Sequence, residues 1–172
     1  GTTTLYSGSL QAGLSSGLSG TFIRIAVDLA GPTFLSGSVV LDGGFPGDGK
    51  ALATTNKGLL RQVDAGALTL WTLSSFGNTG TYQIENDLGI THQDIWAALD
   101  QREPYVERFT NTGTFSKIGG AGTSVVDMAF DNTTDVVHKT SGQVVVASGT
   151  LRLQAGGAHS QGSFSTGTGA AL

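Results

Sequence analysis

Three aspartates lie within nine residues of one another, at Asp127, Asp131 and Asp135. Most glycosidases use two carboxyl groups, one on each side of the scissile bond, so a pair from this group would suit hydrolysis of a sugar chain. That chemistry requires both carboxylates to face one groove. The spacing instead places the three on different strands or corners of one repeat, with side chains that point in different directions. We therefore predict no catalytic residue and keep a carbohydrate-active enzyme as the alternative.

A glycine-rich turn offers oxygen ligands for calcium. Asp42 and Asp48 bracket the stretch Asp42-Gly43-Gly44-Phe45-Pro46-Gly47-Asp48-Gly49, and calcium prefers carboxylate and carbonyl oxygens in turns of this kind. The stretch only faintly matches the Gly-Gly-x-Gly-x-Asp repeat of calcium-binding β-rolls, and it occurs once where a β-roll needs tandem copies. An ordinary turn is the favoured interpretation, so we predict no cofactor, with calcium as the alternative.

Other metals have no ligand pattern in the chain. His92, His138 and His159 are scattered, without His-x-x-x-His or a comparable spacing, and there is no nucleophile motif such as Gly-x-Ser-x-Gly. The chain has no cysteine, which excludes disulfide and thiolate-metal frameworks.

Side chains suited to recognition gather in one irregular stretch. Residues 88–108 concentrate charge and proline, and Thr91 to Leu99 has the capping residue and spacing of a short helix. Trp and Arg are enriched at binding hot spots. The binding candidates are Trp96, Arg102, Tyr105 and Arg108. The alternative for Trp96 is a structural one, in which it covers the core beneath the loop. Trp71 lies in a strand predicted over 67–73 and is expected to belong to the core.

A repeated sequence motif predicts the strands and corners on which these residues lie. Phe-x-Asn-Thr-Gly/Thr occurs at Phe76, Phe109 and Phe130, and the last two copies are 21 residues apart. A phrase that returns at this interval is typical of a solenoid. The first interval, Phe76 to Phe109, is 33 residues. The excess predicts a loop or short helix projecting over 88–108, and not a missing coil.

Short runs of Val, Leu, Phe and Thr between glycines predict three strands per coil of about 21 residues. Projecting the 21-residue step along the chain predicts which side chains stack on the inside. One inward column is Phe109, Phe130 and Leu151, and a second is Phe115, Val136 and Phe164. Asn78, Asn111 and Asn132 share one phase, which is consistent with hydrogen bonds from coil to coil or with each amide closing its own turn.

Composition narrows the class of protein. The 172 residues suffice for one domain, only 13% are charged, and the net charge is −4. The sparse Lys and Arg leave no continuous basic face, so we propose neither nucleic acid nor a membrane surface as a partner. No apolar run has spanning length, and the chain opens on Gly1 without an initiator Met, as expected of a mature or excised segment.

Four segments carry a family resemblance: Asn111 to Lys117, Ser141 to Val146, Ser148 to Leu153, and Gly162 to Ser165. Together they resemble the glycine- and threonine-rich repeats of large secreted bacterial β-helix proteins of the adhesin and autotransporter-passenger type. The resemblance is good over residues 60–172 and loose before them. It implies an extracellular or cell-surface location and a right-handed coil, and it transfers no functional residue.

The sequence thus predicts an all-β protein, a right-handed parallel β-helix formed as a single domain over residues 1–172. The repeat pattern has no obvious polar cap at either end, so we expect strand edges that pair with further coils of the same chain or with identical chains stacked end to end. The expected function is a non-enzymatic structural or adhesive module, with a surface glycan or protein receptor as partner. The alternatives are the carbohydrate-active enzyme and a β-sandwich carbohydrate-binding module, which would show antiparallel pairing and a Trp lying flat on a surface.

Overall fold

The computed structural model describes residues 3–5, 8–11, 23–42, 50–71, 73–93 and 107–172. Within these ranges the chain is all-β, with no helix. Its strands form three parallel sheets, here called sheets A, B and C, and one small antiparallel hairpin. Parallel pairing throughout the three sheets is incompatible with the β-sandwich alternative.

Each sheet takes one strand from each successive coil. Sheet A contains β1 (Thr3–Leu5), β4 (Thr33–Leu35), β7 (Leu59–Gln62), β10 (Thr81–Ile84), β13 (Thr114–Lys117), β18 (Gln143–Val146) and β20 (Ser163–Thr166). Sheet B contains β2 (Gly8–Gln11), β5 (Ser38–Asp42), β8 (Ala67–Trp71), β11 (Ile90–Gln93), β14 (Thr123–Val126) and β19 (Thr150–Leu153). Sheet C contains β3 (Ile23–Leu29), β6 (Lys50–Asn56), β9 (Ser74–Asn78), β12 (Arg108–Asn111) and β15 (Ala129–Asn132).

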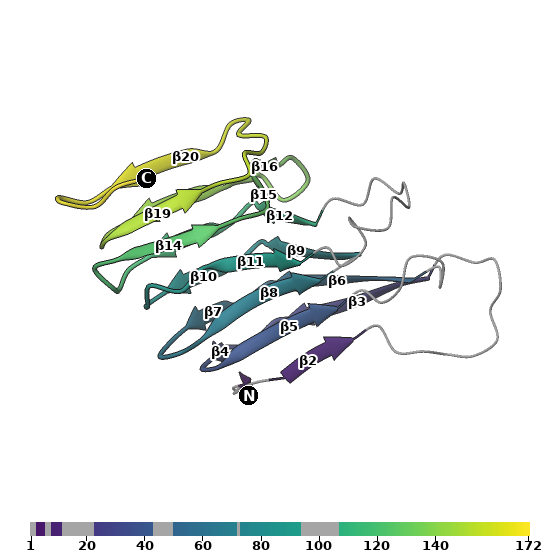
Figure 1. Cartoon of the computed structure of the whole chain (residues 1–172). Coiled ribbons are helices and arrows are strands. Elements are labelled where there is room, and N and C mark those ends of the chain that lie inside the picture. Colours follow the sequence, from purple (N-terminus) through teal and green to yellow (C-terminus); the bar gives the residue numbers. More distant parts are fainter. Residues whose placement is uncertain (1–2, 6–7, 12–22, 43–49, 72, 94–106) are drawn as a thin grey trace.

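The chain visits the sheets in the order A, B, C and then repeats. In Figure 1 the strands of sheet B run from left to right in front while coils are added from bottom to top, which is the sense of a right-handed helix. The predicted right-handed parallel β-helix with three strands per coil is confirmed.

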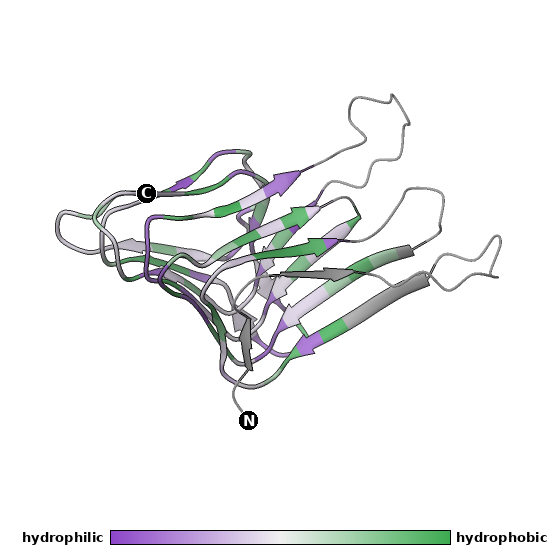
Figure 2. Cartoon of the chain, turned by 60° about the horizontal axis from the view of Figure 1, so that its bottom comes forward, coloured by the Kyte–Doolittle hydropathy of each residue, from purple (hydrophilic) through white to green (hydrophobic). Residues whose placement is uncertain are grey.

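Alternation along the strands explains why these residues form sheets. In β8 the side chains of Leu68 and Leu70 are buried, whereas Ala67, Thr69 and Trp71 are only partly covered. The same alternation between apolar and polar residues is visible along many strands in Figure 2. One face of each strand therefore points into the coil, where it can be buried only against the coils above and below.

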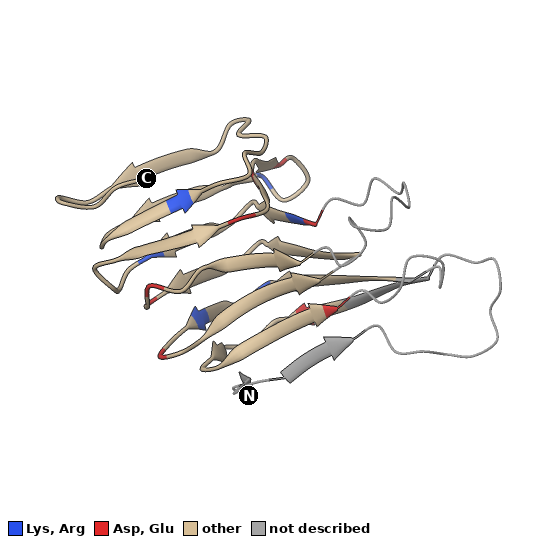
Figure 3. Cartoon of the chain, in the orientation of Figure 1, with Lys and Arg blue, Asp and Glu red and all other residues tan. Residues whose placement is uncertain are grey.

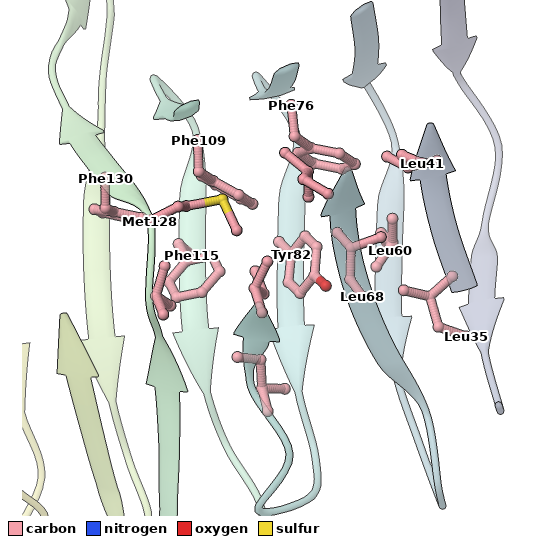
Figure 4. Packing of buried hydrophobic residues seen from close by; sticks show 14 of the residues in the cluster. Leu35, Leu41, Leu60, Leu68, Phe76, Tyr82, Phe109, Phe115, Met128 and Phe130 are labelled. Carbon is pink, nitrogen blue, oxygen red and sulfur yellow. The ribbon is translucent and has the colours of Figure 1, made fainter. Parts of the chain in front are cut away.

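Aromatic rings fill the centre of the stack (Figure 4). Phe76, Phe109 and Phe130 share one register position, and successive ring centroids lie 5.0 and 5.2 Å apart in stacked geometry. Tyr82 and Phe115 pack against this column from sheet A. The stacking of Phe109 on Phe130 confirms the first two members of the first predicted column.

The other column assignments need correction. Leu151 is fully buried, but it lies in sheet B beside Ser124 and not above Phe130. Val136 is 80% exposed, and Val144 takes its predicted place between Phe115 and Phe164.

An insertion explains both errors. The hairpin formed by β16 (Thr134–Asp135) and β17 (Thr140–Ser141) enters the chain directly after Asn132-Thr133. Without it the sequence would read Asn-Thr-Gly, as at Asn78 and Asn111, because the residue that follows the hairpin is Gly142. The hairpin therefore shifts every later residue away from the simple 21-residue step.

The glycine of this Asn-Thr-Gly corner has a steric cause. A Cβ on Gly113 would overlap the carbonyl oxygen of Gly80, the equivalent glycine one coil earlier. Gly142 is similarly crowded, by the backbone of Asn111 and the side chain of Asn132. Successive coils can approach this closely only where the side chain is a hydrogen.

The predicted insertion over 88–108 is shorter in the structure. Ile90–Gln93 is strand β11 and Arg108 begins β12, so the helix expected from Thr91 is wrong for its first three residues. Phe76 pairs directly with Phe109, which confirms that the 33-residue interval is a single coil. The remainder, residues 94–106, lies outside the described residues, and so do Trp96, Arg102 and Tyr105.

Candidate functional site

Four asparagines form a hydrogen-bonded ladder along the corner between sheets C and A. We call Asn56, Asn78, Asn111 and Asn132 the amide ladder. Each Nδ2 of the first three donates to the Oδ1 of the next, over 2.8, 2.7 and 2.9 Å. Each of the four also donates to a backbone carbonyl of the following coil, at Thr81, Thr114, Gln143 or Ser163.

The amide ladder confirms the coil-to-coil interpretation of Asn78, Asn111 and Asn132 and extends it by one residue. The sequence separations of its steps are 22, 33 and 21 residues, so the ladder keeps its register where the coil length changes. It starts at Asn56 because Leu29, the neighbour below, has no amide to offer. Asn56 has no Phe-x-Asn-Thr phrase before it, which is why sequence reasoning missed it.

A second polar cluster lies at the corner between sheets A and B. The Lys117 side chain is completely buried, and its Nζ donates to the carbonyl oxygens of Asn86 and Gly119, both at 2.8 Å, and to Oδ1 of Asp87 at 3.0 Å. We call these groups the lysine cage. Three acceptors satisfy the three N–H groups of the ammonium. The hydrogen bond from Lys117 holds the pKa of Asp87 below its usual value.

Asn86 extends this cluster to three coils. Its side-chain amide donates to the carbonyl oxygens of Asp64 and Gly66 in the coil below. The backbone carbonyl oxygen of Asn86 accepts from Lys117 Nζ and from the Ser124 hydroxyl in the coil above. A lysine at an inward strand position was the available sequence signal, and it was not used.

Tyr82 is a buried phenol in the same part of the core. Its hydroxyl donates to Oε1 of Gln62 at 3.0 Å, and burial raises its pKa. The hydroxyl therefore stays neutral and serves as a structural donor.

The three aspartates considered for glycoside hydrolysis each bind a different partner. Asp127 accepts from the backbone and ring of His92, Asp131 from Arg108 and the Ala158 N–H, and Asp135 from the backbone and ring of His138. They lie directly after β14, on β15 and in the inserted hairpin, respectively. The structure does not bring any two of them together in a shared site.

The remaining candidate residues for metal binding and recognition also do not form a shared site among the described residues. Asp42 ends β5 and is partly buried, while Asp48 lies outside the described residues. Among the described residues no group of three or more His, Asp or Glu side chains is arranged to hold a metal ion. Arg108 is not part of a projecting loop, because it belongs to β12 and pairs with Asp131 on the outside of sheet C.

An aromatic side chain that we did not expect lies on the outer face of sheet B. Leu68 and Leu70 point inward, so Trp71 and Thr69 point outward, and Trp71 is half-buried instead of belonging to the core as its strand position had suggested. Gln93 is in register with Trp71, and Thr91 with Thr69. We call Thr69, Trp71, Thr91 and Gln93 the sheet B patch.

The last coil leaves a strand at the sheet edge. β20 pairs with β18 on one side and is the terminal strand of sheet A among the described residues. Phe164 lies in the inward column above Val144 and contacts the ring of His159, yet it is 38% exposed. An apolar side chain and a row of backbone groups are therefore accessible at this end of the stack.

Within the described residues there is no helix long and apolar enough to cross a membrane. No family model matches the chain, and comparisons with curated proteins and with solved structures find no similar protein. What the molecule does must therefore be argued from its own geometry.

Proposed function

We propose that the chain is a non-enzymatic extracellular module, a segment of β-solenoid rod that stacks end to end and presents a recognition surface. The observation that carries this proposal is the open strand edge at β20, which continues the register of the coils below it. An unpaired edge of this kind is a template for another strand.

The hydrogen-bond pattern shows which backbone groups are available there. The N–H groups of Ser163 and Gly167 bond to Gly142 and Val146 of the coil below. Because neighbouring residues of a strand point their N–H groups to opposite sides, those of Phe164 and Thr166 face away from that coil. A further coil, from the same chain or from an identical one, would accept these groups and cover Phe164.

The positions of the long connections between strands support the proposal of a recognition surface. Residues 12–22, 43–49 and 94–106 each join a strand of sheet B to a strand of sheet C. The coils thus differ in length mainly at one corner, while their strands keep a constant register. Trp96, Arg102 and Tyr105 belong to the longest of these connections, and a receptor contact through them remains our proposal.

No specific observation favours the carbohydrate-active enzyme. That function requires two acids converging in a groove, whereas Asp127, Asp131 and Asp135 each have a separate partner. We therefore propose one function only.

The stacking proposal is tested by blocking the edge without disturbing the coil. Thr166→Pro removes an N–H that faces the open side, whereas Ser165→Pro removes one that the alternation assigns to the coil below. We expect wild-type protein to associate with rising concentration in sedimentation velocity, and Thr166→Pro to remain monomeric with an unchanged melting temperature. Ser165→Pro is the matched control and should melt at a lower temperature. Equal association of wild-type protein and Thr166→Pro would contradict stacking through this edge.

A further inference from the structure

We infer that the sheet B patch binds a neutral glycan, with Trp71 as the stacking platform and Thr69, Thr91 and Gln93 as polar contacts. This inference rests on the proposed adhesive function and gives it a ligand class and a location. It assigns recognition to the flat side of the solenoid, in addition to the connections at its corner.

The geometry of the patch is a small grid on two adjacent strands. Trp71 and Gln93 are register partners on β8 and β11, and so are Thr69 and Thr91. The two threonine hydroxyls lie 2.9 Å apart and share a hydrogen bond. Neighbouring strands of a sheet are about 4.8 Å apart, so one aromatic ring, one amide and two hydroxyls fall within the reach of a single sugar unit and its neighbour.

The chemistry of these side chains matches a sugar better than other ligands. A pyranose ring has an apolar face of C–H groups and a rim of hydroxyls. An indole supplies a large rigid apolar surface. A carboxamide and a hydroxyl each both donate and accept hydrogen bonds, as sugar hydroxyls do. Both Thr91 and Gln93 are exposed, and Trp71 is half-buried, so a ligand can reach all three side chains.

The charge of the surface indicates a neutral ligand. β8 and β11 carry no Lys, Arg, Asp or Glu, and neither strand has a blue or red residue in Figure 3. His92 lies between Thr91 and Gln93, and its ring nitrogen is 3.1 Å from the carboxylate of Asp127. The nearest charges along the sheet are Asp42 at the end of β5, Asp127 after β14 and Arg152 on β19, where the guanidinium bonds to Gln154. No cationic cluster on this face would favour an acidic polysaccharide or a phosphate.

Hydrogen bonds hold the backbone at the end of β8, next to the platform. The Ser74 hydroxyl donates to the Trp71 carbonyl oxygen at 2.5 Å. Two residues after Trp71, Leu73 donates its N–H to Oε1 of the buried Glu107 at 3.3 Å, and its carbonyl accepts from the N–H of Leu52. Hydrogen bonds at Trp71 and Leu73 reduce the backbone ordering that ligand binding would require, which favours affinity.

The experiment is affinity electrophoresis of the full chain through gels that contain one soluble polymer each. The neutral probes are dextran, mannan, xylan and hydroxyethyl cellulose, and alginate is the anionic probe. We expect at least one neutral polymer to retard the protein and alginate not to. Trp71→Ala should weaken that retardation roughly tenfold or more, as expected for a central aromatic contact.

Matched variants separate binding from folding. Gln93→Ala and Thr91→Val alter exposed side chains and should weaken binding roughly two- to tenfold with unchanged melting temperatures. Phe34→Ala, an outward aromatic residue on sheet A that lies beneath the Arg61 guanidinium, is the control and should bind normally. In a Trp96→Phe background, Trp71 is the single tryptophan, and its emission should shift on titration with the retarding polymer.

The inference is wrong if none of the four neutral polymers retards the protein, or if alginate alone retards it. It is also wrong if the Trp71→Ala and Gln93→Ala variants bind the polymer as tightly as wild-type protein does. Sedimentation of the same samples distinguishes this failure from that of the rod function. If wild-type protein associates but binds no neutral polymer, the glycan site is rejected and the proposed rod function stands.

Discussion

At the scale of single residues, the amide ladder links each coil to the next through side-chain hydrogen bonds. Each inner amide binds a side chain above and one below and also caps a backbone carbonyl. Because these amides are fully buried, losing one leaves polar neighbours that water cannot reach.

We expect Asn111→Leu to destabilise the fold by about 3 kcal/mol, since Asn132 Oδ1 and the Gln143 carbonyl lose their donor and Asn78 Nδ2 loses an acceptor. Asn56→Leu should cost less, because the Oδ1 of Asn56 already lacks a donor among the described residues. Urea denaturation measures both variants. Thr110→Val, on the outside of the same strand as Asn111, is the control, with an effect within about 0.5 kcal/mol. Equal losses for the two asparagine variants would count against a continuous ladder.

The lysine cage predicts a dependence of stability on pH. The pKa of Asp87 is lowered in the folded state, so its stabilising contribution is complete above the ordinary aspartate pKa of about 3.9 and is lost as pH falls through the lowered value. Thermal melts between pH 6 and pH 2 should therefore show wild-type protein losing stability at the acid end. Lys117→Met should show a weaker acid dependence.

At neutral pH the same substitution, Lys117→Met, should cost roughly 2–3 kcal/mol. The Gly119 carbonyl loses its Lys117 donor at a corner that links three coils, while the Asn86 carbonyl keeps the Ser124 hydroxyl and Asp87 keeps the Gly122 N–H. Urea denaturation of the variant measures this loss. Val125→Thr, on the outer face of the neighbouring strand β14, is the control. A Lys117→Met protein as stable as wild type would show that the buried ammonium contributes nothing to the corner.

At the scale of elements, the β16–β17 hairpin is an addition to a coil that is complete without it. The Gly142 N–H already bonds to the Thr133 carbonyl across the base of the hairpin, at 2.8 Å. Val136 and Val137 at its tip are 80% and 79% exposed. The hairpin therefore buries none of the apolar surface that stabilises the stack.

Deletion of residues 134–141 should restore the Asn-Thr-Gly corner and change stability by no more than about 1 kcal/mol, since shortening a surface loop costs little. Calorimetry of the deletion variant measures the effect. Deleting residues 114–117 instead removes β13 and should abolish cooperative melting. A hairpin deletion that unfolds the protein would mean that the corner is not equivalent to those at Gly80 and Gly113.

The same hairpin shows where prediction from the sequence succeeded and where it failed. The repeated Phe positions predicted the aromatic column of sheet C, because these residues stack on identical neighbours. The Asn positions predicted a shared phase, and they left the ladder and separate turn closure as alternatives. The step failed after Thr133, where an eight-residue insertion separated Thr from Gly without changing composition. Val136 and Leu151 were misplaced for that reason. Trp71 was misplaced because an apolar strand residue at a coil end can point either way.

Long-range polar contacts were the least predictable part. Lys117 meets Asn86 and Asp87 from thirty residues away, and only the coil register brings them together. No local pattern around Lys117 indicates an oxygen cage. By contrast, the separation of Asp127, Asp131 and Asp135 onto different elements was predictable, because their spacing spans a strand and both of its corners.

At the scale of the whole molecule, the coils form a stack whose cross-section is constant while the connections vary. Register is maintained by inward aromatic rings and by buried polar groups at two corners. The stability of such an architecture is approximately a sum of contributions from the coils and their interfaces, because each coil interacts mainly with its immediate neighbours. The edge at β20 has the backbone geometry that the next coil would need.

Stacking of chains through that edge can be seen by electron microscopy and fibre diffraction of concentrated wild-type protein. We predict rods of constant width whose length grows with protein concentration, with a reflection along the rod axis at about 4.8 Å from strands lying across it. Thr166→Pro should give only short particles under the same conditions. Isolated particles of unchanging size in wild-type protein at every concentration would show that chains do not stack through β20.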